Sequence, residues 1–181
     1  MKILKTKMIR IVITGGPSTG KTSLISELAN FKCTTFPEVA RILIKEQLEI
    51  NSNKVPWDDV SGFSKLVLEK QLIDFNKASH GANIYDRGIP DLIGYMNHGK
   101  QKLFKELKSA AEKFKYQFVF ILSPWKDIYE TDNERRESFA DSVKIYEDIK
   151  NAYIQLGYSP IEVPKDTINN RVSFILSQIN G

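Results

Sequence analysis

Two glycines, a lysine and a threonine at fixed spacing make up the part of this sequence whose chemistry is easiest to predict. Residues 15–22 are GGPSTGKT and match the pattern G-x-x-x-x-G-K-[ST] of the P-loop, or Walker A motif. Glycines let the backbone curl so that successive N–H groups point at one anion. The segment therefore predicts a nucleotide-binding loop in which Lys21 contacts the β- and γ-phosphates of ATP and Thr22 offers its hydroxyl to Mg²⁺.

The predicted nucleotide contacts extend slightly beyond this motif. Ser23 begins the helix that should follow, and Pro164 comes after a short apolar run, where the base of the nucleotide would lie. The full set is Gly15, Gly16, Pro17, Ser18, Thr19, Gly20, Lys21, Thr22, Ser23 and Pro164. A plain turn is the alternative for Pro164.

A second group of chemical interest follows the apolar run 82–86. Asp86 would end a strand beside the phosphate loop, where a carboxylate can hold the water shell of Mg²⁺. Many motor-type ATPases have a glutamate next, which orients an attacking water, but this chain has Arg87. An arginine can clamp an anionic acceptor or the transferring phosphoryl group. The pair therefore favours phosphoryl transfer over hydrolysis, and a surface Asp–Arg pair in a turn is the alternative.

Four further residues are candidates for the acceptor side of the site. Glu38 and Arg41 are three apart, so they would share a helix face as catalytic base and acceptor clamp. The alternative is a first-turn glutamate with a salt-bridged arginine. Asp91 and Trp57 are predicted to contact the acceptor, and the alternatives are a solvated helix residue and a packing tryptophan.

A polar segment at residues 124–137 is predicted to be a lid. It contains two adjacent arginines, Arg135 and Arg136, and either could close over the phosphates and stabilise negative charge in the transition state. The alternative is a solvated, charged start of a helix.

The elements that must position these residues alternate along the chain. Strands are predicted at 9–14, 33–36, 82–86, 118–122 and 161–163. Helices are predicted at 21–30, 38–48, 58–78, 90–97, 101–114, 138–156 and 167–179. This order predicts an α/β fold of three layers around a five-stranded, mostly parallel sheet, in a single domain covering residues 1–181. Ligands in such folds bind outside the carboxyl ends of the strands, where the candidate residues fall.

Composition limits the function classes. The net charge of +4 is spread out, without a run of five like charges, so neither nucleic acid nor a membrane surface is expected as a partner. No apolar run is as long as a membrane span. Cys33 is the single cysteine, which excludes an internal disulfide and favours a reducing, cytoplasmic setting.

Five stretches together resemble a family of small bacterial AAA-type P-loop ATPase/kinase-like proteins. They are ITGGPSTGKTSL, FPEVARILI, YDRGIPDLIGY, YETDNERRESFADSVKIYEDI and AYIQLGYSPIEVP. That family is grouped with the ribosylnicotinamide-kinase region of bifunctional NAD-biosynthesis regulators and with an animal GTP- and lipid-binding relative. The resemblance implies a nucleoside-monophosphate-kinase-like fold with Lys21, Thr22 and Asp86 at the phosphates and Mg²⁺, and with the lid around Arg135. The guanine signature N-K-x-D is absent from the sequence.

The leading hypothesis is an ATP- and Mg²⁺-dependent phosphotransferase acting on a small, hydroxyl-bearing, nucleoside-like metabolite. The alternative is a nucleotide-dependent ATPase or GTP-binding switch with a protein or lipid partner. A third possibility is an inert scaffold. A deep, polar, ring-sized pocket between Glu38, Trp57, Arg87 and Asp91 would support the kinase, and a collapsed or apolar one would support the switch. The identity of the acceptor and the oligomeric state are not predicted.

Overall fold

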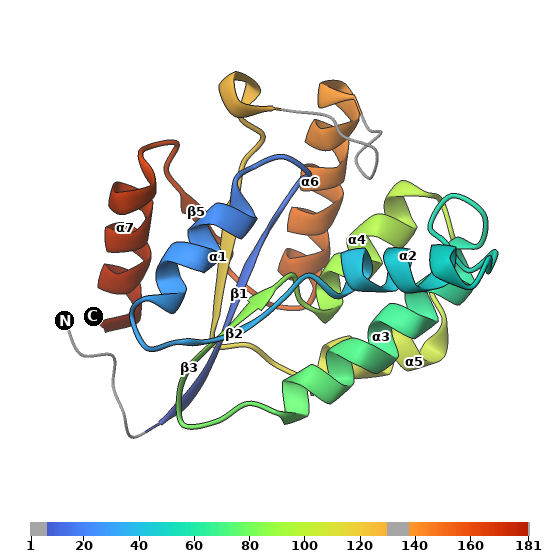
Figure 1. Ribbon diagram of the computed structural model, residues 1–181, viewed down its shortest axis with the longest axis horizontal. Coiled ribbons are helices and arrows are strands. Elements are labelled where there is room, and N and C mark those ends of the chain that lie inside the picture. Colours follow the sequence, from blue (N-terminus) through green and yellow to red (C-terminus); the bar gives the residue numbers. More distant parts are fainter. Residues whose placement is uncertain (1–6, 130–137, 181) are drawn as a thin grey trace.

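Five parallel strands form the centre of the protein in a computed structural model, which describes residues 7–129 and 138–180 (Figure 1). The strands are β1 (Met8–Gly15), β2 (Thr34–Phe36), β3 (Gly81–Asp86), β4 (Phe118–Leu122) and β5 (Ile161–Val163). Their order across the sheet is β2-β3-β1-β4-β5, and each neighbouring pair is parallel. The predicted five-stranded parallel sheet is therefore confirmed, and β1 places its carboxyl end between those of β3 and β4.

Seven α-helices connect and cover the strands within the described ranges. They are α1 (Lys21–Ala29), α2 (Val39–Glu49), α3 (Val60–Asn76), α4 (Ile89–His98), α5 (Lys105–Lys113), α6 (Phe139–Gln155) and α7 (Ile168–Asn180). Each corresponds to a helix predicted from the sequence, although α5 begins at residue 105 rather than 101. The described part of the predicted lid segment, residues 124–129, contains one short 3₁₀ helix, Lys126–Ile128.

The two faces of the sheet are buried by different helices, as Figure 1 shows for α1 and α7 on one side and α6 and α4 on the other. Ile11 and Ile13 of β1 pack in one core with α1 and α7, whereas Val12 packs in another with residues of α6. Side chains alternate between the faces of a strand, so a strand covered on both faces is apolar throughout. That is why the run at 9–14 shows no polar alternation.

A third apolar cluster joins α2, α3, α4 and α5 into a separate helical layer beyond the carboxyl ends of β2 and β3. Helix α4 belongs to this layer and also packs closely on α6. A Cβ atom at Gly94 would lie 2.7 Å from the Cα atom of Ile149, so glycine permits the close approach of the two helices. This approach brings the first turn of α4 within reach of side chains from α6.

In the ranges that the structure describes, no helix combines the length and the apolar character needed to cross a bilayer.

Candidate active site

The phosphate loop connects β1 to α1 and has the backbone geometry that an anion-binding loop needs. Ser18 has a φ of 54° and Gly20 a φ of 79°, so the chain reverses twice before helix α1 begins at Lys21. Lys21 is 6% exposed and its Nζ atom donates to the carbonyl oxygens of Gly16 at 2.7 Å and Gly15 at 3.3 Å. The loop thus holds its own lysine at the N-terminus of a helix, where phosphates are favoured.

Burial and the neighbouring Arg87 guanidinium lower the pKa of Lys21 to about 7, although Asp86, Glu38 and Asp91 act in the opposite direction. A buried lysine in this state gains from an added anion, because a phosphate beside it favours the charged form. The loop is therefore electrostatically prepared for a ligand that carries negative charge.

The two glycines that open the motif are required by close contacts with the rest of the fold. A Cβ atom at Gly15, whose φ is 137°, would lie 2.3 Å from the carbonyl oxygen of Leu122 in β4. At Gly16 it would lie 2.8 Å from the carbonyl oxygen of Ser142 in α6. These residues position the loop, and the side of the loop that faces the cavity consists of residues 17–23.

Asp86 ends β3 directly opposite Ile13 of β1, so its carboxylate lies at the same edge of the sheet as the phosphate loop. Burial and the charge of Glu38 raise its pKa to about 6, against the opposing effect of Lys21 and Arg87. Its buried Oδ1 atom has no hydrogen-bond partner among the described residues. Thr22 is exposed and lines the same cavity. A hydroxyl and an unpartnered carboxylate oxygen are hard oxygen donors, so this pair fits Mg²⁺.

Arg87 has its guanidinium group between two carboxylates. Its Nε atom donates to Oε1 of Glu38 at 2.8 Å, and its Nη1 atom donates to Oδ1 of Asp91 at 3.2 Å and to the carbonyl oxygen of Gly15 at 2.9 Å. Its backbone φ of 71° lies in the left-handed region, which costs a non-glycine residue about 1 kcal/mol or more. Such a conformation persists because the surrounding contacts determine it, as they do here.

Glu38 joins the two arginines that the sequence assigned to the acceptor. Oε2 of Glu38 lies 3.6 Å from Nε of Arg41, while Oε1 accepts from Arg87. Burial favours the neutral form of Glu38, but Arg87, Lys21 and Arg41 outweigh that effect and lower its pKa to about 2. Glu38 is therefore an ionised group that accepts hydrogen bonds, and with so low a pKa it is a weak proton acceptor.

Asp91 is 1% exposed, and both of its carboxylate oxygens accept hydrogen bonds from the protein. The donors are the hydroxyl of Thr14, Arg87 Nη1, the backbone N–H of Gly88 at 2.9 Å and the hydroxyl of Tyr153 at 2.6 Å. The sequence predicted a contact between Asp91 and the acceptor. In the structure its oxygens are engaged by these four donors, and the residue anchors Arg87 and the start of α4.

One cavity of about 970 Å³ extends from the phosphate loop to the helical layer. Its lining includes residues predicted from four separate stretches of the sequence, which therefore face one space: Lys21, Thr22, Glu38, Arg41, Trp57, Asp86, Arg87 and Asp91. Trp57, 45% exposed, stands at its rim. Pro164 does not line this cavity, and the corresponding loop contributes Asp166 and Thr167 instead. The contact between Pro164 and the nucleotide base therefore stays a prediction.

Sequence reasoning missed two residues at the nucleotide end of the cavity. Arg171 of α7 is 4% exposed, and its Nη2 atom donates to the carbonyl oxygen of Thr19 at 3.1 Å. Its guanidinium carbon lies 6.0 Å from the ring centre of Trp125, which follows β4. An arginine on the apolar face of the closing helix was the available signal, since such a residue is rarely buried without a partner.

Arg135 and Arg136, the predicted lid arginines, lie outside the described residues.

The model of the AAA domain family matches residues 10–171 of the chain. A search of curated proteins found no significant match.

Solved structures provide further likenesses. Thymidylate kinase from Candida albicans is 19% identical, with 96% of this chain and 92% of that chain covered and a TM-score of 0.65. For deoxyadenosine kinase from M. mycoides with bound dCTP the identity is 14%, the coverage 95% and 99%, and the TM-score 0.62. The NadR protein in complex with NR is 14% identical, with 97% of this chain but 50% of that chain covered and a TM-score of 0.65.

These likenesses confirm the predicted nucleoside-monophosphate-kinase-like fold. The fold is similar to that of nucleotide kinases. Because the family model covers most of the sequence, the chain belongs to the AAA domain family.

Proposed function

We propose that this protein is an ATP- and Mg²⁺-dependent phosphotransferase whose acceptor is a small, nucleoside-like metabolite with a free hydroxyl. The observation that carries the proposal is the shape of the cavity, which continues from the phosphate loop past Glu38 and Arg87 to Trp57. Its volume of about 970 Å³ is at the upper end of the range for small-molecule sites, and it leaves room for a second ligand beyond a nucleotide. A switch that binds only nucleotide has no need of this additional space.

At the donor end, backbone N–H groups of the phosphate loop and the Lys21 ammonium group hold the phosphates of ATP. Thr22 and Asp86 are the residues that would hold Mg²⁺, which when bound neutralises charge on the phosphate oxygens. Arg171 fixes the loop by binding the Thr19 carbonyl oxygen. Arg135 and Arg136 complete the proposal as lid residues that approach the transferring group.

At the acceptor end, Glu38 accepts a hydrogen bond from the acceptor hydroxyl and so aims its oxygen at the γ-phosphate. Phosphoryl transfer passes through a loose transition state, in which the hydroxyl oxygen bonds to the γ-phosphorus as the bond to ADP breaks, and the hydroxyl proton passes late to the Glu38 carboxylate. A carboxylate with a pKa of about 2 is suited to orienting the hydroxyl, since early proton abstraction would need a stronger base. Arg87 lies between Glu38 and the phosphate loop, where positive charge stabilises the transferring phosphoryl group.

The replacement Glu38→Gln tests this assignment. We expect kcat to fall about 100-fold while the affinity for ATP stays within about twofold, because the amide orients the hydroxyl poorly and is remote from the nucleotide base. The matched control is Glu46→Gln on α2, the helix that begins directly after Glu38, and the Glu46 carboxylate pairs with Lys70 at the surface. Equal rates in the Glu38→Gln variant and the natural protein would show that Glu38 has no role in transfer.

A further inference from the structure

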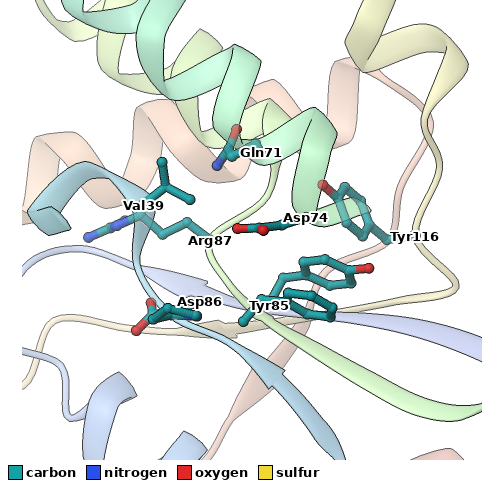
Figure 2. Close-up of a pocket in the computed structure, with 9 residues that line it drawn as sticks. Val39, Gln71, Asp74, Tyr85, Asp86, Arg87 and Tyr116 are labelled. Carbon is teal, nitrogen blue, oxygen red and sulfur yellow. The ribbon is translucent and has the colours of Figure 1, made fainter. Parts of the chain in front are cut away.

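Gln71 on α3 is a buried polar residue that the proposed mechanism does not use. It is 7% exposed, and in the part of the chain that the structure describes its Oε1 atom has no hydrogen-bond partner. It lines both the main cavity and a smaller hollow beside it. Figure 2 shows its amide on the same side of this hollow as Val39 and the Arg87 side chain.

A buried amide oxygen without a partner, such as Oε1 of Gln71, is unfavourable, and folded proteins rarely retain one. A leucine of similar volume at this position would preserve the packing of α3 and would leave no polar atom without a hydrogen bond. An unpartnered amide oxygen on the wall of a ligand cavity is explained when the ligand supplies the missing donor. The position of Gln71 then indicates which part of the ligand it meets.

Gln71 ends a stripe of side chains along one face of α3. Val60, Phe63, Val67 and Gln71 are spaced three or four residues apart, and all four line the main cavity. The first three offer apolar surface, and the fourth offers an amide at the smaller hollow that Arg87 also lines. A flat ring lying along this stripe would bury its faces on apolar groups and present one polar edge to Gln71.

We propose that Gln71 is the residue that recognises the ring of the acceptor, by pairing its amide with a ring edge that carries adjacent hydrogen-bond donor and acceptor groups. A lactam, an amidine or a carboxamide provides such an edge, because a side-chain amide also has one donor and one acceptor side by side. The inference rests on the proposed function, since it assumes that the part of the main cavity beside α3 holds the acceptor. It adds a substrate class: a ring-bearing nucleoside, as opposed to a sugar alone.

Calorimetric binding to the intact protein, saturated with a non-hydrolysable ATP analogue and Mg²⁺, tests this assignment. The probes are adenosine, cytidine, uridine and methyl β-ribofuranoside, which has the sugar hydroxyls of the other three but no ring. The variant is Gln71→Leu, and the matched control is Gln155→Leu at an exposed position of α6. We expect at least one nucleoside to bind more tightly than the methyl riboside, and to lose about tenfold or more of its affinity in Gln71→Leu only. Binding of the methyl riboside should be unchanged.

Two results would overturn the assignment of Gln71. One is that no nucleoside binds better than the methyl riboside, and the other is that Gln71→Leu weakens all four probes equally. Thermal unfolding of the unliganded variant gives an independent reading, because removal of an unpartnered amide should leave the midpoint equal or higher. A lower midpoint would show that the amide has a partner within the protein. Since binding is measured without transfer, a nucleoside that binds through Gln71 but receives no phosphate would contradict only the proposed function.

Discussion

The hydroxyl of Tyr153 is predicted to stabilise the protein through a single hydrogen bond to Asp91. Tyr153 is fully buried on α6, and its hydroxyl donates to Oδ2 of Asp91 at 2.6 Å. Burial and the charge of Asp91 raise the pKa of Tyr153 well above its ordinary value, so the hydroxyl remains a donor. The replacement Tyr153→Phe removes this donor and leaves almost no cavity. A hydrogen bond to a charged group contributes about 1.5–3 kcal/mol, so the expected loss of stability is about 2 kcal/mol.

Urea denaturation measures this loss. With an m value of about 2 kcal/mol/M, a loss of about 2 kcal/mol lowers the midpoint by about 1 M. The matched control is Tyr146→Phe on the same helix, where the hydroxyl lies 3.2 Å from Oε2 of Glu162. The Glu162 side chain is 52% exposed, and water can replace the lost bond, so this change should cost about 0.5 kcal/mol or less.

A double-mutant cycle separates the hydrogen bond from other effects of the substitution. In an Asp91→Asn background, Tyr153→Phe should cost less than about 1 kcal/mol, because the charged acceptor is already absent. If Tyr153→Phe lowers the midpoint no more than Tyr146→Phe does, or costs the same with and without Asp91, the anchoring of Arg87 by Asp91 and Tyr153 is wrong.

Two further predictions concern the titration of the phosphate site. Because the pKa of Lys21 is about 7, the side chain is mostly neutral at pH 8, and binding of Mg²⁺–ATP should take up close to one proton. Calorimetry in two buffers of different ionisation enthalpy should show this uptake for the natural protein but not for Lys21→Met. The pKa of Asp86 is raised to about 6 from 3.8, so the unliganded protein loses stability as the pH rises through 6. In urea titrations, Asp86→Asn should therefore stabilise the unliganded protein by about 3 kcal/mol at pH 8 and have little effect at pH 4. A stabilisation that does not change with pH would refute the burial of an ionised Asp86.

The sheet and the phosphate loop could be predicted because their signals are local. The apolar run at 9–14 followed by GGPSTGKT needs only neighbouring residues to specify a strand, a turn and a helix. The residues that end other strands followed from the topology, since the carboxyl ends of parallel strands meet at one edge. This is why Glu38 and Arg87 were expected to lie together although they are 49 residues apart in the sequence. In the structure, Nε of Arg87 lies 2.8 Å from Oε1 of Glu38.

Roles that depend on long-range packing could not be predicted in the same way. Asp91 had the signature of a solvated or ligand-facing helix residue. Its four donors come from β1, from α6, and from Arg87 and Gly88 between β3 and α4. Gln71 and Arg171 are polar residues on apolar helix faces. Only tertiary contacts show that Arg171 binds the phosphate loop and that Gln71 lines the cavity. Sequence periodicity indicates which face of a helix is buried but not which group lies opposite.

The fate of the γ-phosphate is the most direct test of the central claim. In a single turnover with γ-labelled ATP, Mg²⁺ and a mixture of nucleosides, we expect the label to move from ATP to a nucleoside hydroxyl in the natural protein, and this transfer to be at least about 100-fold slower in Glu38→Gln. If the label leaves ATP only as inorganic phosphate in the presence of every acceptor, the cavity beyond Glu38 does not serve phosphoryl transfer.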